Sequence, residues 1–239
     1  MGTAAARARL VLIHPLTVRL THWVTALAIF VMVGSGWRIY DWDPIFDWLW
    51  FPFAYTLGGD PRLSQITHNE EGLAGALQWH FAGMWLLAAS FLAYVLYGLL
   101  SGHFRRHLLP ITPRAVLRDL GAALTGHLGH EVGQRNAVQK LLYLGVIALI
   151  LLMLLTGLAI WKPVQLYSLT WLFGGYPVAR VVHFLGMAAI VGFVVVHLAL
   201  VALVPRVLPP MITGRARVDA AAASTSVADK EIAPKEIAP

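Results

Sequence analysis

The sequence predicts an all-α membrane protein built as a bundle of four transmembrane helices. Hydrophobic residues make up 58% of the 239 positions and charged residues only 13%, whereas a soluble domain carries about 25% charged residues. Four apolar stretches each reach the length of about 20 residues that a helix needs to cross a bilayer. None of them has Asp or Glu in its interior, so none shows the polar stripe of a helix at a soluble surface.

The four spans are expected at about residues 17–38, 77–100, 137–160 and 179–204. They form one transmembrane domain over residues 1–205. Residues 206–239 are expected to be a cytoplasmic, disordered tail, because its end is rich in alanine and has little that could form a core.

Basic and acidic residues alternate between successive loops. The N-terminus, the loop between spans two and three, and the segment after span four hold Arg7, Arg9, Arg19, Arg105, Arg106, Arg114, Arg118, Arg135, Lys140, Arg206, Arg215 and Arg217. The loop between spans one and two holds Asp41, Asp43, Asp47, Asp60, Glu70 and Glu71, with Arg62 as its one basic residue. Because Lys and Arg gather in cytoplasmic loops, both termini and the middle loop are expected to face the cytoplasm.

The acidic outer loop, residues 39–76, is long and aromatic, with Trp42, Trp48, Trp50, Phe51 and Tyr55. Its segment Pro44–Leu57 fits two roles, an aromatic belt in the membrane interface and a docking surface for a partner. The sequence leaves the choice between these roles open.

The chain has no cysteine, which excludes iron–sulfur clusters, c-type haem attachment, thiolate zinc sites and disulfides. The chain has ten histidines, which can bind metals through the imidazole ring. Six of the ten lie outside the spans and are expected to be solvated or interfacial: His14, His68, His103, His107, His127 and His130.

The other four histidines, His22, His80, His183 and His197, lie within spans, where an ionisable residue suggests function. His183 and His197 are fourteen positions apart in span four. They therefore share nearly the same helix face and are separated by about 21 Å along the axis. One metal ion cannot use both, so two separate sites are expected.

Depth in the membrane assigns a second histidine to each site. Span four runs inward, so His183 lies near the outer face and His197 nearer the inner face. His80 begins the inward-running span two, and His22 begins the outward-running span one. The expected pairs are His80 with His183 on the outer side and His22 with His197 on the inner side.

Two imidazoles without a nearby carboxylate suit six-coordinate haem iron, which carries electrons and has no open position for a substrate. Zinc and copper sites usually need a third ligand, and a di-iron site needs buried Glu. Gly83 and Gly186 each follow an outer histidine by three residues, and Gly34 and Gly36 lie at the outer level of span one. These glycines fit close approach of a haem and ordinary helix packing equally well. The third span has no histidine and is expected to be a packing helix.

Arginines at the levels of the two sites are candidate partners for the anionic haem propionates. Arg19 precedes His22 by one turn, and Arg38 and Arg180 lie at the outer level. Each of the three also fits a role in snorkelling to lipid phosphate.

Four segments resemble the cytochrome b subunits of bacterial respiratory enzymes: formate dehydrogenase gamma, nickel–iron hydrogenase cytochrome b and thiosulfate reductase cytochrome b. They are VRLTHW (18–23), QWHFAGMWL (78–86), NAVQK (136–140) and HFLGMAAIVGFVVVH (183–197). The stretch YGLLSGHFRRHLLP (97–110) is most similar to the thiosulfate-reductase branch. The resemblance covers about residues 14–205.

This resemblance implies a multi-pass protein of the bacterial inner membrane that holds two b haems. It implies a periplasmic redox partner, an iron–sulfur, molybdenum or hydrogenase protein, at the outer haem and a quinone at the inner haem. The segment matching NAVQK lies by the quinone in the formate dehydrogenase relatives, which carries over to Asn136, Gln139 and Lys140. Val138 stands where relatives have glycine, and Asn136 also fits a plain helix N-cap.

The leading functional hypothesis is an electron-transfer subunit between a periplasmic redox enzyme and the quinone pool. A stand-alone dihaem superoxide:quinone oxidoreductase is the alternative, although an acidic outer loop would repel that anion. A small transporter is a third possibility, but the spans have no interior proline and so lack the broken helices typical of transport sites.

Overall fold

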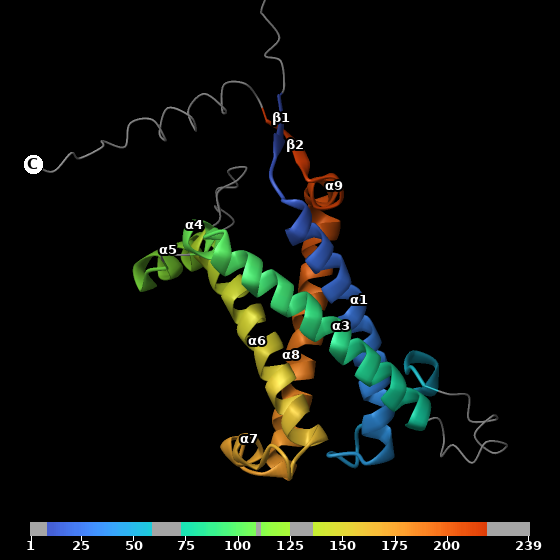
Figure 1. Cartoon of the computed structure of the whole chain (residues 1–239). Helices are drawn as coiled ribbons and strands as arrows, with labels where there is room; N and C mark the ends of the chain where they lie inside the picture. Colours follow the sequence, from blue (N-terminus) through green and yellow to red (C-terminus); the bar gives the residue numbers. More distant parts are fainter. Residues whose placement is uncertain (1–8, 59–72, 109–110, 125–135, 219–239) are drawn as a thin grey trace, which may run out of the picture.

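The computed structural model describes residues 9–58, 73–108, 111–124 and 136–218. The parts of the outer loop, the middle loop and the tail that hold His68, His127, His130 and residues 219–239 lie outside the described residues. Four long helices dominate the rest (Figure 1): α1 (Leu16–Trp42), α3 (Leu73–Leu100), α6 (Ala137–Trp161) and α8 (Tyr176–Leu203). Each is long and apolar enough to cross a membrane, which confirms the predicted all-α, four-span architecture.

The helix ends differ slightly from those expected. Helix α1 continues past Arg38 to Trp42, and α3 begins at Leu73 instead of Leu77. Both extensions belong to the outer end of the bundle. A hydropathy pattern marks the hydrocarbon region only, whereas backbone hydrogen bonding continues beyond it.

The helices form two antiparallel pairs, α1 with α3 and α6 with α8. Small residues allow close approach within each pair. A Cβ added at Gly83 of α3 would lie 2.8 Å from Met32 Cγ of α1, and one added at Gly186 of α8 would lie 2.6 Å from Met153 Sδ of α6. Gly83 and Gly186 therefore serve helix packing.

Aromatic side chains connect one pair to the other. Tyr40 of α1 lies with its ring 4.9 Å from that of Phe184 of α8, and Phe81 of α3 lies 5.1 Å from Trp161 of α6. Both contacts lie toward the outer ends of these helices. The two pairs thus meet through large side chains, whereas each pair packs internally through glycine.

The described part of the outer loop folds back on the end of α1. The backbone N–H of Leu57 donates to the Gly34 carbonyl over 2.8 Å, and Phe51 stacks on Trp37 with centroids 4.7 Å apart. The loop contains the short 3₁₀ helix η1 (Phe53–Tyr55). Trp48 is 78% exposed, so this segment presents an aromatic outer surface, as does α7 (Tyr167–Leu172).

At the opposite end of the bundle, two short helices connect α3 to α6 (Figure 1): α4 (His103–His107) and α5 (Pro113–Leu124). Gly98 of α3 lies directly against Phe104 of α4, since an added Cβ would meet the ring at 2.2 Å. Helix α4 is therefore tightly packed onto the end of α3.

The beginning and the end of the described chain form a clasp of two antiparallel strands, β1 (Arg9–Leu12) and β2 (Arg215–Val218). The 3₁₀ helix η3 (Pro205–Val207) and helix α9 (Leu208–Thr213) lead from α8 to β2. The Gly214 carbonyl accepts from the N–H groups of Ile13 and His14 at 2.8 and 3.2 Å.

This clasp corrects the expectation that residues 206–239 are a disordered tail. Residues 206–218 are ordered, because strand pairing with β1 and side chains of α1 satisfy their backbone groups. The Trp23 indole donates to the Met211 carbonyl over 3.3 Å, and Arg19 donates to the Ile212 carbonyl. Long-range pairing of two four-residue strands leaves no local signal in the sequence.

Candidate functional site: two histidine pairs

The outer pair joins the two halves of the bundle. His80 lies in the second turn of α3 and His183 in the second turn of α8. Their ring centroids are 6.4 Å apart, with the ring planes inclined by 64°. The two residues come from different helix pairs, so the gap between them lies at the junction of the halves.

The inner pair has nearly the same geometry. His22 lies near the start of α1 and His197 near the end of α8. Their ring centroids are 6.2 Å apart and their planes are inclined by 65°. The structure therefore brings together the two pairs that depth in the membrane predicts, and it brings them together with matching separations.

These separations fit a metal ion between each pair. Metal–imidazole bonds of about 2.0–2.1 Å, plus about 1 Å from each nitrogen to its ring centroid, put two opposed imidazoles about 6 Å apart. Among the described residues no group of three or more His, Asp or Glu is arranged to hold a metal. The side-chain donors available at each pair are thus two imidazoles, a set that fits six-coordinate haem iron.

A hydroxyl group contacts each outer histidine from the partner helix in its own pair. Ser35 Oγ of α1 lies 3.1 Å from His80 Nδ1, and Thr156 Oγ1 of α6 lies 2.8 Å from His183 Nδ1. Both hydroxyl residues are completely buried. Helix α6 therefore does more than close the bundle, because it supports an outer histidine.

Sequence reasoning missed Ser35 and Thr156, although a signal was present. Spans one and three share the pattern M-x-x-[S/T]-G at residues 32–36 and 153–157, and spans two and four share H-F-x-G-M at residues 80–84 and 183–187. The two halves of the bundle repeat one arrangement of hydroxyl, glycine and histidine.

The glycine after each hydroxyl residue makes room for the histidine ring. A Cβ added at Gly36 would lie 3.4 Å from His80 Cε1, and one at Gly157 would lie 3.3 Å from His183 Cε1. Gly34 instead lies beneath the outer loop, because a Cβ added at Gly34 would lie 3.3 Å from Leu57 Cβ. Of the glycines singled out in the sequence, Gly36 is the one beside an outer histidine ring.

The three arginines considered as propionate partners contact protein groups. Arg19 donates from Nη1 to the Ile212 carbonyl, and the Arg38 guanidinium lies 3.8 Å above the Phe53 ring. Arg180 Nη1 pairs with Asp43 Oδ2 at 2.7 Å. All three lie near the ends of long helices, at the levels expected from the sequence. Their binding of haem propionates stays a prediction.

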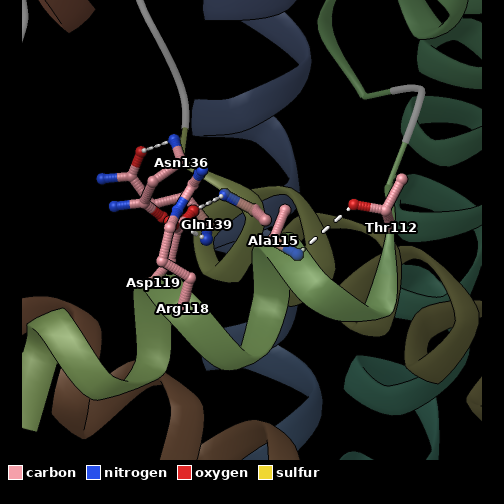
Figure 2. A network of polar contacts seen from close by, with 7 residues as sticks. Thr112, Ala115, Arg118, Asp119, Asn136 and Gln139 are labelled. Atoms are coloured by element: carbon pink, nitrogen blue, oxygen red, sulfur yellow. Dashed lines mark hydrogen bonds and ion pairs between the residues drawn. The ribbon is translucent and has the colours of Figure 1, made fainter.

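Asn136 and Gln139 form the N-terminal cap of α6. Asn136 Oδ1 accepts from the Gln139 N–H over 2.8 Å, and Gln139 Oε1 accepts from the Asn136 N–H over 3.3 Å (Figure 2). This is a capping box, so the N-cap role is real. Lys140 lies in the first turn of the same helix.

Asp119 of α5 completes the polar network at this helix end (Figure 2). Its Oδ2 accepts from the Ala137 N–H over 2.7 Å, and its Oδ1 lies 3.0 Å from Arg118 Nη2. The hydrogen bond from the Ala137 N–H, followed by Arg118, holds the pKa of the Asp119 carboxyl below its ordinary value. A carboxylate is stabilised there because a helix N-terminus carries partial positive charge.

Comparison with known proteins finds relatives over most of the chain. The chain is 47% identical over 203 residues, 84% of its own length and 96% of the relative's, to the "Putative protein-methionine-sulfoxide reductase subunit YedZ1" of Azospira oryzae. It is 24% identical to the "Probable Ni/Fe-hydrogenase B-type cytochrome subunit" of Bradyrhizobium diazoefficiens, covering 82% of this chain and 80% of that one.

A third relative is the "Formate dehydrogenase, nitrate-inducible, cytochrome b556(Fdn) subunit" of Escherichia coli K12, 25% identical over 77% of this chain and 71% of that one. These relatives bear the names of subunits of redox enzymes, which confirms the predicted resemblance to hydrogenase and formate dehydrogenase cytochromes. The model of the prokaryotic cytochrome b561 family matches residues 13–214. The chain is therefore a multi-pass, haem-binding electron-transfer protein that belongs to the prokaryotic cytochrome b561 family.

Proposed function

We propose that this chain is the membrane subunit of a two-component redox enzyme and conducts electrons through two bis-histidine b haems. The observation that carries the proposal is the pair of imidazole–imidazole separations, 6.4 Å and 6.2 Å. His80 and His183 would hold the outer haem, and His22 and His197 the inner one. Bound haem supplies one-electron transfer between ferric and ferrous iron.

The contribution of the protein is to position the two sites. Helix α8 would supply one ligand to each site and fix their separation at about 21 Å along its axis, because the two histidines are fourteen positions apart. With two imidazoles on each iron no coordination position would be open, so the chain would relay electrons and leave substrate chemistry to its partners.

The proposed orientation puts both termini and the α4–α5 region in the cytoplasm of a bacterium, and α7 and the outer loop in the periplasm. The described residues on the cytoplasmic side include Arg105, Arg114 and Arg118, whereas the described outer loop contributes Asp41, Asp43 and Asp47. Such asymmetry sets orientation in the inner membrane. It puts His80 and His183 at the periplasmic side.

The partner that we propose at the periplasmic side is a reductase that acts on methionine sulfoxide in proteins. The support is the relative from Azospira oryzae. The match covers 96% of that protein, and its name includes this activity. Reduction of a sulfoxide consumes two electrons, so quinol oxidised at the inner site would supply the outward flow. The exposed aromatic loop and α7 give such a partner a surface.

Histidine substitutions test the two haem sites. His183→Ala should remove the outer haem and halve the haem content per chain, and His197→Ala should remove the inner haem instead. The matched control is His103→Ala in α4, outside both pairs, which should keep two haems. Haem per chain is measured on purified protein by extraction and absorbance, and redox titration identifies which potential is lost. One haem in the unsubstituted chain would contradict the proposal.

A further inference from the structure

We propose that Ser35 and Thr156 are positioning residues that fix the proton on His80 and His183 and thereby lower the potential of the outer haem alone. This inference rests on the proposed haem sites and goes beyond their ligands. The hydrogen of each hydroxyl group is bonded within its own helix. The Ser35 hydroxyl donates to the Val31 carbonyl over 2.7 Å, and the Thr156 hydroxyl donates to the Leu152 carbonyl over 2.8 Å.

A hydroxyl has a single hydrogen to donate. Because that hydrogen is engaged with a carbonyl one turn back in the helix, the oxygen faces the imidazole as an acceptor. His80 Nδ1 and His183 Nδ1 must then carry hydrogen and donate it to Ser35 Oγ and Thr156 Oγ1, at 3.1 and 2.8 Å. In both imidazoles the lone pair is left on Nε2, the nitrogen that a metal binds.

The two supports are equivalent in the two halves of the bundle. Ser35 and Thr156 occupy the same position in M-x-x-[S/T]-G, and each is followed by the glycine whose backbone lies against the histidine ring. Both hydroxyl residues are completely buried and both histidines are half-buried, so water has little access to the hydrogen bond. The outer site is therefore held on both sides by the same device.

The inner pair has a different environment. Among the described residues no hydroxyl oxygen is within hydrogen-bonding distance of His22 or His197. His197 instead stacks on Phe193 with centroids 5.7 Å apart, and His22 lies edge-on to Trp23 at 5.3 Å. Any effect of hydroxyl acceptors on haem electronics is thus confined to the outer site.

The direction of this effect follows from charge. A hydrogen bond accepted from Nδ1–H increases the electron donation of the imidazole to its metal. Ferric iron gains more from this donation than ferrous iron does, so the bond stabilises the ferric state and lowers the potential. Loss of one such bond should shift the ferric–ferrous equilibrium by up to about tenfold, equal to about 59 mV for one electron.

Redox titration of the purified full chain with both haems bound tests the inference. Ser35→Ala and Thr156→Val should each raise the outer potential and leave the inner one unchanged, and their double variant should add the two shifts. Electron paramagnetic resonance of the ferric outer haem should change with them. Ser35→Thr and Thr156→Ser keep the hydroxyl and should keep the original potential.

The matched control is Thr25→Val, which removes a hydroxyl bonded to Ser90 at 2.9 Å in the same α1–α3 interface, away from the histidines. Selective loss of the outer haem from Ser35→Ala or Thr156→Val would also support a positioning role, since such partners tune metal affinity. An unchanged outer potential with both haems bound, equal shifts at both haems, or loss of both haems together would overturn the inference. Failure of the unsubstituted chain to bind two haems would instead refute the proposed function.

Discussion

Asn136 is the N-cap of α6, and its predicted second role, as a hydrogen-bond donor to quinone, can be tested separately by one substitution. The capping box uses the amide oxygens of Asn136 and Gln139, so the amide NH2 groups stay outside the cap as donors for a quinone carbonyl. Ser caps a helix about as well as Asn but lacks that NH2 group.

Asn136→Ser should therefore keep haem content and helix stability while it slows reduction of the inner haem by quinol, by roughly tenfold for one lost hydrogen bond. Stopped-flow spectroscopy with a quinol analogue measures the rate. Asn136→Ala is the companion variant and should also destabilise α6 by about 0.5–2 kcal/mol. Unchanged quinol kinetics in Asn136→Ser would leave Asn136 with the cap role alone.

Asp119 predicts a pH dependence at the α5–α6 junction. Its pKa is lowered in the folded chain, chiefly by the Ala137 N–H, so the ionised carboxylate favours docking of α5. This contribution is fully present above the ordinary Asp pKa of about 3.9 and is lost as pH falls through the lowered folded value.

Asp119→Asn should loosen α5 at neutral pH, as acid does in the unsubstituted chain. Hydrogen exchange of the α5 amides measures this loosening, with Arg114→Gln as the control on the exposed side of the same helix. Equal exchange protection in Asp119→Asn and the unsubstituted chain at neutral pH would contradict a docking role for the carboxylate.

The importance of a residue could be predicted from the sequence where its side chain is energetically unfavourable in a membrane. Histidine in hydrocarbon is rare enough that His22, His80, His183 and His197 stood out, and depth alone paired them. Ser35 and Thr156 did not stand out, because a hydroxyl bonded to its own helix is inexpensive in a span. Their significance depends on a neighbouring helix, which the sequence does not specify.

Among the elements, the close packing of α1 with α3 depends on Gly83. Gly83→Ala would bring a Cβ to 2.8 Å from Met32 Cγ and 3.2 Å from Val31 Cγ1. Overpacking of this kind costs about 1–3 kcal/mol, so we expect a lower temperature of haem loss. Thermal denaturation followed at the haem absorbance band gives this temperature.

The control is Gly145→Ala in α6, where an added Cβ meets nothing within 4 Å and helix propensity should slightly favour alanine. Adding Met32→Ala to Gly83→Ala should restore much of the lost stability by making room. If Gly83→Ala is as stable as Gly145→Ala, the helices do not depend on this contact.

Elements with a strong period or composition were predictable, and those made by long-range pairing were not. Four stretches of about 20 apolar residues predict the four spans, and Asn136 as an N-cap predicts the start of α6. The clasp of β1 and β2 joins segments about 200 residues apart, and neither strand has a distinctive pattern. The predicted disordered tail was wrong over residues 206–218 for this reason.

For the whole molecule, the absence of native cysteine makes orientation directly measurable. Val164 is 81% exposed beside α7, and the Arg118 side chain is 76% exposed on α5. In intact spheroplasts a membrane-impermeant maleimide should label Val164→Cys at once and Arg118→Cys only after the membrane is permeabilised, because the two lie on opposite sides. The unsubstituted chain, which has no thiol, is the background control, and the reverse labelling order would invert the proposed topology.

The repeated construction of the two helix pairs has a consequence for the inner end. The sequence repeat that relates α1 to α6 and α3 to α8 relates His80 to His183. Applied to the inner ligands, the same register relates His22 to Tyr143 and His197 to Tyr94. In sequence, the repeat therefore relates each inner histidine to a tyrosine of the other helix pair. The two helix pairs thus contribute equivalent residues to the pair His80 and His183, and different residues to the pair His22 and His197.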